Sequence, residues 1–443
     1  MAEATIFAPE VGYGYAEVAG APNRWEKALA VAGFIVLLET FRTGLAAGAS
    51  DRGDGSTLFQ LVSGLIYLSG IAALLLRGIP AWALRVLVRC WPLVFLLLLP
   101  LMSTVWSDAP SQTLRRAIAL LLSSSFAFFL LVRFDMRTFF NLLAVAFGVY
   151  VVVGILAAAL PGVGITPNGT YAGAWRGLTG QKNTFGRTMA IAVALLPVAA
   201  TIGLASRRRP VLIVSAFCLV LLVLAHSATA LVAAVAGVGV GTVLYFALGG
   251  WVGRFRLRPE IGVTFLLIAG FAGWALVTFG WTTILEALGR DPTLTGRTQL
   301  WNWAIGLSED RRWLGAGYRA FWIDANTKYF FESFAWNQDI DGNRSDSFAG
   351  PEHAHSGYVD TLIELGRVGV TALALTIFWA LKTLRSALVR GNPQVGFIFA
   401  VILSFLLIYA ITERSILQQS EDLWFFFTAL FFYATRETLL EEA

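Results

Sequence analysis

Long apolar runs separated by short polar segments make up most of the chain. A helix of about 20 apolar residues crosses the hydrocarbon core of a bilayer, and about twelve runs approach that length. The predicted spans cover residues 28–48, 58–76, 91–105, 116–132, 138–160, 188–206, 211–226, 229–249, 261–280, 367–384, 395–411 and 421–435. Because the runs are continuous rather than alternating, they predict helices and argue against an outer-membrane barrel. We therefore predict an all-α integral membrane protein with about 12 transmembrane helices.

Composition supports this class. Hydrophobic residues make up 57% of the chain and charged residues only 14%, whereas a soluble domain has about 25% charged residues. These values exclude a soluble globular enzyme, a disordered chain and a fibrous one. The two cysteines, Cys90 and Cys218, lie in or beside apolar runs, so neither a disulfide framework nor a cysteine metal site is expected.

Positive charge sets the expected orientation. If the N-terminus is cytoplasmic, lysines and arginines concentrate in the loops that then lie inside, such as residues 207–209 and 254–258, as the positive-inside rule requires. The net charge of +5 is then explained by cytoplasmic loops rather than by nucleic-acid binding. Both termini are predicted to be cytoplasmic.

The spans divide the chain into three parts. Residues 1–280 hold the first nine spans, residues 281–366 form one large outside loop, and residues 367–443 hold the last three spans. Loops of this length are usually functional. Within the loop, residues 297–307 and 356–365 are predicted to be helical, the second leading into the next span.

The loop after the fifth predicted span is suited to an anion. Residues 173–187 hold four glycines and three cations, Arg176, Lys182 and Arg187, directly before a helix. Glycines let the backbone approach a ligand closely, and the helix N-terminus adds positive partial charge. A phosphate would fit here. The alternative is an ordinary turn whose cations lie at the lipid headgroups.

Arg297 is a second candidate anion ligand. Thr295 or Gly296 can cap a helix that places Arg297 in its first turn. A cation is unfavourable at that end of a helix, so we expect another group to hold it there, and a bidentate anion would explain the choice of arginine. The alternative is a surface arginine.

The chain has three histidines, and two of them, His353 and His355, lie in the large loop. A zinc site would need a third ligand from Asp360, Glu364 or Glu352, but no known spacing fits. A general base is favoured over zinc, because the pKa of histidine lies near working pH.

Few ionisable groups lie within the predicted spans. Glu39 and Arg42 are three residues apart in the first span, so they can pair on one helix face. Ion-coupled transporters place charged groups near the membrane midplane. A transporter or channel is therefore the less favoured alternative.

The order of these motifs resembles the bacterial superfamily of O-antigen ligases and exopolysaccharide repeat-unit polymerases. The Trp-Arg-Gly sequence at residues 175–177 and the Gln-Lys-Asn sequence at 181–183 are similar to a segment of the polymerases. Residues of four further segments resemble the central block of the superfamily: 295–301, 315–318, 354–358 and 362–366. Ser356 stands where the family usually has asparagine.

The resemblance implies transfer of a glycan from undecaprenyl pyrophosphate on the periplasmic face of the bacterial inner membrane. The reaction it implies is inverting and uses no metal or other cofactor. Carried over, Arg176 and Arg297 would clamp the pyrophosphate, with Lys182 and Arg187 as helpers. His355 would take the proton from the acceptor hydroxyl.

The aromatic residues and the partners follow from the same resemblance. Tyr318, Tyr358, Trp301 and Trp303 would stack on sugar faces. A repeat-unit polymerase, whose acceptor is another glycan, is favoured by the segment at residues 175–183; an O-antigen ligase, whose acceptor is the lipid A core, is the close alternative. A noncatalytic scaffold of polysaccharide export is less favoured. The expected partners are the lipid-linked donor, the acceptor and membrane lipids, with a chain-length regulator plausible for a polymerase and no nucleic acid.

Overall fold

The computed structural model describes residues 21–39, 57–168, 171–249, 297–323, 353–419 and 421–440. Within these ranges the protein is helical, and the only β pairing is an isolated bridge between Ile165 and Trp175. The predicted ninth span, 261–280, and the centre of the large loop lie outside the described residues. The all-α membrane class is confirmed.

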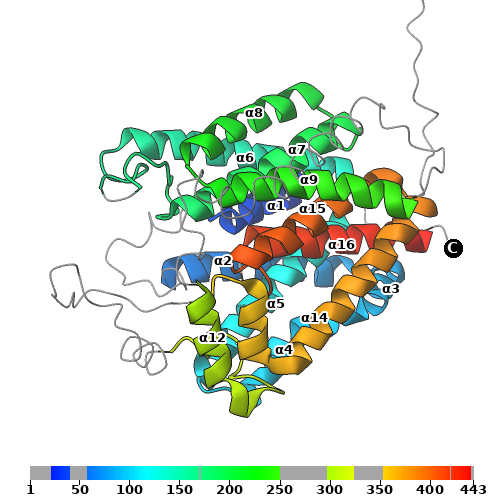
Figure 1. The fold of residues 1–443 in the computed structure, drawn as a ribbon. Helices are drawn as coiled ribbons and strands as arrows, with labels where there is room; N and C mark the ends of the chain where they lie inside the picture. Colours follow the sequence, from blue (N-terminus) through cyan, green and yellow to red (C-terminus); the bar gives the residue numbers. More distant parts are fainter. Residues whose placement is uncertain are drawn as a thin grey trace, which may run out of the picture.

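Figure 1 shows the arrangement of the helices, most of which coincide with the predicted spans. Their bounds are α1 Arg24–Leu37, α2 Thr57–Arg77, α3 Ala81–Arg89, α4 Trp91–Met102, α5 Pro110–Arg133, α6 Met136–Ala159, α7 Lys182–Thr201, α8 Arg208–Leu224, α9 Ala228–Gly249, α12 Arg297–Leu307, α14 Gly357–Val389, α15 Pro393–Thr412 and α16 Asp422–Leu440. Two short 3₁₀ helices, η2 Ser103–Val105 and η3 Glu309–Arg311, complete the described elements. Helix α1 differs from its predicted span: it ends at Leu37, whereas the first predicted span continues to residue 48, and residues 40–48 lie outside the described residues.

Seven of the described helices are long and apolar enough to cross a membrane: α2, α5, α6, α7, α9, α14 and α15. An eighth span is formed if α3 and α4 count as one, although they bend by 77° at Cys90. Pro92 near the start of α4 explains the bend, because proline has no N–H for the preceding turn. A multi-pass membrane protein is therefore established, whereas the predicted number of twelve spans is not confirmed.

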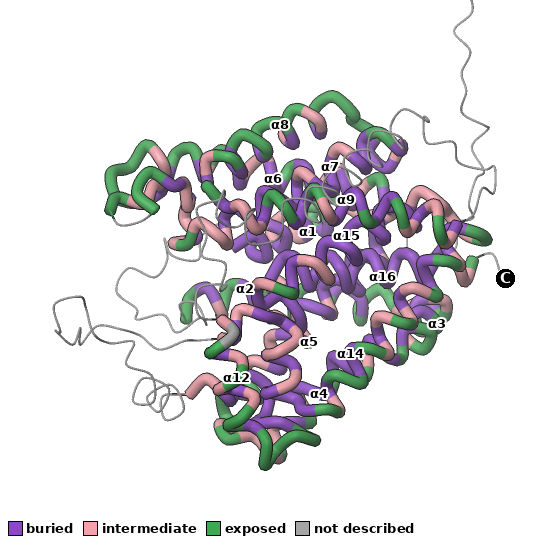
Figure 2. The backbone as a smooth tube through the Cα atoms, in the orientation of Figure 1, coloured by how far each residue is buried: buried purple, intermediate pink, exposed green. Residues whose placement is uncertain are grey.

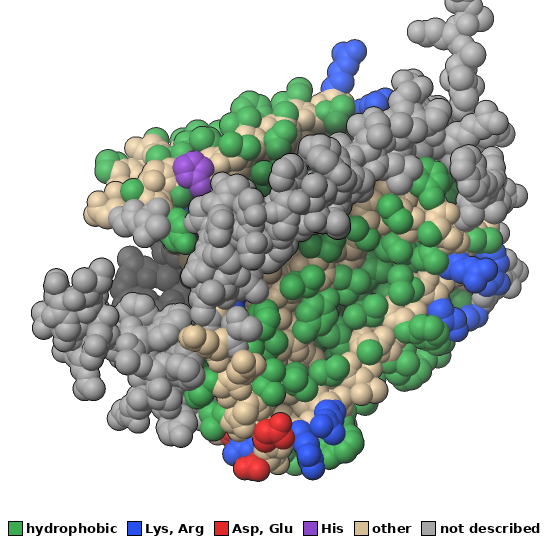
Figure 3. Space-filling model, viewed as in Figure 1, with side chains coloured by type: hydrophobic (Ala, Val, Ile, Leu, Met, Phe, Trp, Pro, Cys, Tyr) green, Lys and Arg blue, Asp and Glu red, His purple; other side chains and the backbone are tan. Residues whose placement is uncertain are grey.

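Helices α15 and α16 run through the centre of the bundle and are buried along most of their length (Figure 2). Helix α9 packs against α15 through Gly237 and Gly241. A Cβ at Gly241 would lie 2.8 Å from the Cα of Val401, so glycine is needed for this close approach. On the face seen in Figure 3 the described surface is mostly apolar, and its charged side chains gather at the margins, as expected of a surface that faces lipid.

A break in α14 joins the large loop to the bundle. Gly366 has φ 65° inside this helix, which interrupts the helical hydrogen bonds and frees backbone groups on both sides. The carbonyls of Ile363 and Glu364 accept hydrogen bonds from the N–H groups of Ala316 and Gly317 at 3.0 and 2.9 Å. The predicted helix at residues 356–365 and the following span are thus two halves of α14, and the glycine between them docks the loop.

Replacing Gly366 by alanine is expected to destabilise the fold. The left-handed backbone alone costs about 1–3 kcal/mol for other residues, and the added Cβ would lie 2.3 Å from the carbonyl of Trp313. Thermal melting of the purified protein in detergent would show a lower melting temperature. Gly306→Ala is the matched control, because Gly306 is helical and has no atom within 4 Å of an added Cβ; equal melting of both variants would contradict the account.

Candidate active site

Three segments that are far apart in sequence meet at one end of the bundle. Helix α12 begins at Arg297, α14 is preceded by His355, and α15 ends at Thr412, directly before Glu413. The N–H of Gly357 donates to the carbonyl of Glu413 at 3.2 Å, which ties the start of α14 to the end of α15. Glu413 therefore lies between the predicted arginine and the predicted histidine.

Arg297 is held by the end of α15. Its Nη1 donates to the carbonyl of Thr412 at 2.5 Å, and its Nη2 lies 3.7 Å from Oε1 of Glu413. Its side chain is 14% exposed. These contacts explain why a cation is tolerated in the first turn of α12, and they leave guanidinium donors for an anion.

His355 lies beside the same carboxylate. Its Nδ1 is 3.6 Å from Oε2 of Glu413, and 42% of its side chain is exposed. The backbone of His355 is left-handed, with φ 51°, and its N–H donates to Nδ1 of His353 at 3.1 Å. The two imidazole rings lie 4.1 Å apart between centroids. This arrangement leaves Nε2 of His355 for a substrate hydroxyl and directs Nδ1 at a carboxylate that can stabilise the protonated ring.

His353 is expected to make the protein less stable in mild acid. Burial, followed by the neighbouring His355 and arginines 414, 319 and 297, lowers the pKa of His353 well below 6.5. Below about pH 6.5 the unfolded chain binds a proton at His353 that the folded chain does not. The free energy of unfolding therefore decreases as the pH is lowered, by at most about 1.4 kcal/mol per pH unit. Melting temperatures from pH 8 to pH 5 would show this fall for the wild type.

His353→Asn removes the titrating group, while its side-chain oxygen still accepts from the N–H of His355. The decline between about pH 6.5 and pH 5 should become shallower in this variant. An identical pH profile for the variant and the wild type would rule out His353 as the source.

A buried charged network lies behind this pair. Nη2 of Arg414 donates to both carboxylate oxygens of Glu364 at 2.9 and 3.0 Å. Nη1 of Arg319 donates to Oε1 of Gln419 at 3.0 Å, and burial beside Arg414 and Arg116 lowers the pKa of Arg319 to about 10. The network fixes residues 414–419, which follow Glu413, against the large loop.

The predicted sugar-stacking aromatics have structural partners. Nε1 of Trp301 donates to the carbonyl of Ala354 at 2.7 Å, which positions the residue before His355. Trp303 packs against Phe321 and Trp322. Each tyrosine hydroxyl donates to a backbone carbonyl: Tyr318 to Leu417 at 2.5 Å and Tyr358 to Leu407 at 2.9 Å. Because Tyr318 is 1% exposed, its burial favours a structural role.

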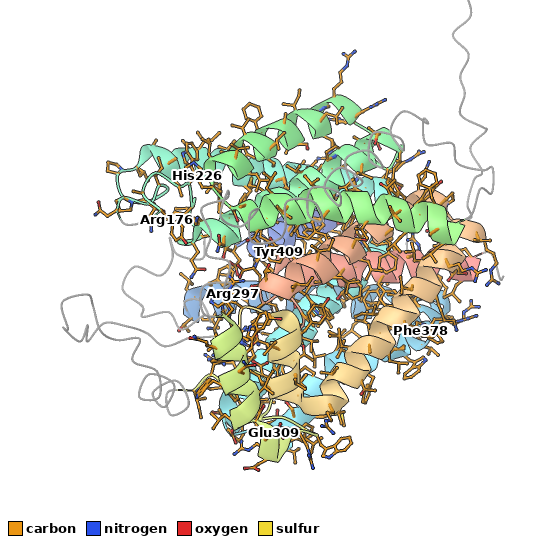
Figure 4. All side chains as sticks on the ribbon, in the orientation of Figure 1. Arg176, His226, Arg297, Glu309, Phe378 and Tyr409 are labelled. Atoms are coloured by element: carbon orange, nitrogen blue, oxygen red, sulfur yellow. The ribbon has the colours of Figure 1, made fainter. Side chains whose placement is uncertain are left out.

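The other predicted cations contact different residues; Figure 4 labels one of them, Arg176, together with Arg297. Arg176 donates to the carbonyls of Gly162 and Val163 at 2.7 and 3.0 Å, within its own loop. Nζ of Lys182 lies 3.2 Å from the carbonyl of His226 and 3.5 Å from the ring centroid of Tyr171.

Arg187 is buried in an ion pair between α7 and α16. Its Nε donates to Asp422 at 2.8 Å, its Nη1 lies 3.2 Å from Glu421, and Thr188 also donates to Asp422. The carboxylates of these partners neutralise the charge of Arg187. In this structure Arg187 therefore ties the first turns of α7 to the start of α16. The described contacts thus bring together Arg297, His355 and Trp301, but not Arg176, Lys182 or Arg187.

Glu413 is the site residue that the sequence analysis missed. Its only sequence signal is an acidic residue directly after an apolar run. Among the described residues no three His, Cys, Asp or Glu side chains converge as metal ligands; Glu352, one of the third ligands considered for zinc, lies outside them.

Comparison with known proteins supports the resemblance that the sequence motifs indicated. Residues 213–374 match the family model of the O-antigen ligases. This range contains Arg297 and His355 but not Arg176, Lys182, Arg187 or Glu413. The chain is also 29% identical over 154 residues to the exopolysaccharide production protein ExoQ of Rhizobium meliloti (strain 1021). That match spans about a third of this chain and a third of the relative's length, 33% in each case. The resemblance to the O-antigen ligase and polymerase superfamily is confirmed.

Proposed function

We propose that this protein is a membrane glycosyltransferase that moves a glycan from undecaprenyl pyrophosphate to a glycan acceptor. The observation that carries the proposal is that Arg297 and His355 both lie beside the carboxylate of Glu413. Arg297 and His355 also lie within the range that matches the O-antigen ligases, residues 213–374. A base and an anion ligand on one carboxylate form the minimal set for displacing a phosphate leaving group.

The chemistry follows from these positions. Nε2 of His355 takes the proton of the acceptor hydroxyl as its oxygen attacks the anomeric carbon. The bond from that carbon to the pyrophosphate oxygen breaks, which inverts the configuration and leaves negative charge on the pyrophosphate. The free donors of Arg297 stabilise this charge, and Glu413 stabilises the protonated imidazole. The distance of 3.6 Å from Nδ1 to Glu413 is expected to shorten when substrate binds.

The other sequence-predicted residues enter the proposal in weaker roles. Arg176 lies in the loop before α7 and Lys182 is the first residue of α7, and they would contact the donor only if the chain there rearranges around it. Tyr358, Trp301 and Trp303 remain proposed sugar contacts. Arg187 and Tyr318 act through buried partners, so we propose that they position the surrounding helices and loop.

A repeat-unit polymerase is the favoured version, because the relative from Rhizobium meliloti is an exopolysaccharide production protein. The match to the O-antigen ligases keeps a ligase, with the lipid A core as acceptor, as the second candidate. In both versions we propose an inner-membrane location, cytoplasmic termini and a site on the periplasmic side, formed by the loop at residues 281–366 between helices of residues 1–280 and 367–443. A chain-length regulator remains a proposed partner of the polymerase.

Surface glycans from cells that lack the protein test this proposal. Single repeat units without long chains, restored to full length by the wild-type gene, would support the polymerase. Long glycan that stays on its lipid carrier and does not reach lipid A would support the ligase. An unchanged glycan profile would contradict both.

A further inference from the structure

Asp360 is a buried carboxylate in the first turn of α14 that the proposed mechanism does not use. The residue is 3% exposed. Its Oδ1 accepts two hydrogen bonds, one from Nε1 of Trp322 at 2.9 Å and one from the N–H of Ala354 at 3.0 Å. Although Asp360 is one of the residues considered as a third zinc ligand, Oδ1 faces two N–H donors and therefore acts as a hydrogen-bond acceptor.

Ala354, which directly precedes His355, is held on both sides. Its N–H donates to Asp360 on α14, and its carbonyl accepts from Nε1 of Trp301 on α12 at 2.7 Å. The residue itself is fully buried. Because two separate helices fix both backbone groups of Ala354, the point at which the chain enters His355 is fixed as well.

The backbone of His355 needs such an anchor. Its φ of 51° lies in the left-handed region, which is uncommon for residues other than glycine and persists only where the surroundings hold it. In this conformation its N–H bonds Nδ1 of His353 at 3.1 Å, and its own Nδ1 lies 3.6 Å from Glu413. A chain released from Asp360 would relax towards an ordinary backbone and carry the imidazole away from Glu413.

The buried network behind the site also holds Asp360. Burial lowers the pKa of the Arg414 guanidinium, but the carboxylates of Glu364 and Asp360 raise that pKa by more. Asp360 and Arg414 therefore attract each other, while Nη2 of Arg414 bonds Glu364. The network that fixes residues 414–419 thus fixes the acceptor of the Ala354 N–H too.

We propose that Asp360 is a positioning residue for glycan transfer: it holds the N–H of Ala354 so that Nε2 of His355 meets the acceptor hydroxyl while Nδ1 faces Glu413. This role rests on the proposed function, in which His355 is the general base. A displacement of about 1 Å at a reacting group can lower a rate about a hundredfold. Loss of the Trp322 bond should matter less, because it leaves the bond to Ala354 in place.

Substitutions at Asp360 test the hydrogen bond directly. Asp360→Ala removes the acceptor and is expected to lower transfer about ten- to a hundredfold in membranes that contain equal amounts of folded protein. Asp360→Asn keeps an oxygen that can accept both hydrogen bonds, so it should recover most of the lost rate. Equal rates for the two variants would overturn the proposal, because the charge of Asp360 and not its bond to Ala354 would then be required.

Thr361→Val is the matched control. Thr361 is 4% exposed and lies in the same turn of α14, but its hydroxyl donates to the carbonyl of Gly357 within the helix at 2.7 Å. This variant removes a buried hydrogen bond of α14 without touching Ala354, so it should transfer at the wild-type rate. A loss as large as that of Asp360→Ala would overturn the specific role of Asp360.

Combining Asp360→Ala with His355→Asn separates positioning from a general loss of structure. If Asp360 acts through His355, the double variant should transfer at about the residual rate of His355→Asn alone, since residues that act as a unit have non-additive effects. A further ten- to hundredfold fall would overturn the proposal, because Asp360 would then act independently of the base.

NMR spectra of the full-length protein, labelled only at histidine and held in detergent micelles, test the anchor without glycan transfer. The chain has three histidines, and His226 lies between α8 and α9 as an internal control. Asp360→Ala should shift the signals of His353 and His355 but not those of His226. The pKa of His353 should rise towards 6.5, because opening the turn reduces the burial that lowers it. Unchanged signals of His353 and His355 would overturn the proposal.

The outcomes separate the role of Asp360 from the proposed function. If His355→Asn abolishes transfer but Asp360→Ala transfers at the wild-type rate, only the role of Asp360 fails. If the wild type transfers no glycan, the proposed function fails, and the histidine spectra still decide whether Asp360 holds the turn at residues 353–355.

Discussion

Replacing His355 by asparagine is expected to reduce glycan transfer by about a hundred- to ten-thousand-fold, the usual contribution of a general base. Asparagine is the sharpest substitution here, because it tolerates the left-handed backbone of His355, with φ 51°, but cannot take a proton at neutral pH. The protein should therefore fold and insert normally. Transfer would be measured as the rate of glycan elongation in membranes that contain equal amounts of each protein.

His226→Asn is the matched control for this experiment. His226 has the same φ of 51° and lies between α8 and α9, so the substitution has the same backbone effect outside the proposed site. Its transfer rate should equal that of the wild type. A His355→Asn variant that retains wild-type rates would remove the base from the mechanism.

Replacing Arg297 by alanine is expected to lower transfer by about a hundred- to a thousand-fold, the effect of losing one donor to a developing negative charge. Arg297→Lys should be closer to the alanine variant than to the wild type. Lysine keeps the charge but cannot bond the Thr412 carbonyl and a phosphate with one planar group. The same membrane assay measures both variants.

Arg312→Lys, at an exposed position that follows η3, controls for a general need for arginine in the loop. Its rate should be unchanged. Full activity of Arg297→Lys would show that only charge matters at this position, which contradicts a bidentate contact.

The sequence predicts the helices well because hydropathy decides them. The bend between α3 and α4 lies where proline marks the third predicted span, and the division between α8 and α9 lies at His226 and Ser227, where the apolar run is interrupted. The sequence predicts a boundary at Gly366, between the loop and the next span. It does not predict that the break in α14 docks the large loop. Only the structure shows that the freed carbonyls of α14 bind the Gly-Ala-Gly sequence at residues 315–317.

The site was predictable in part. Arg297 and His355 stand out because they are charged or titratable residues in a long loop, and the structure places both at Glu413. The local signal of Glu413, an acidic residue directly after an apolar run, does not indicate its role, because that role depends on the end of α15 reaching residues more than fifty positions away. Arg187 carries the same sequence signal as a ligand-binding arginine, yet it pairs with Asp422 across the bundle. Long-range pairing of charges is therefore the information that the sequence lacks.

The most direct test of the account is glycan transfer by the purified protein in lipid vesicles that contain undecaprenyl-pyrophosphate-linked repeat units. The account predicts that the wild type converts single repeats into longer lipid-linked glycans, that His226→Asn does so equally, and that His355→Asn does not. Elongation by His355→Asn at the wild-type rate would contradict the proposed site, and an absence of transfer by the wild type to either repeat units or lipid A core would contradict the proposed function.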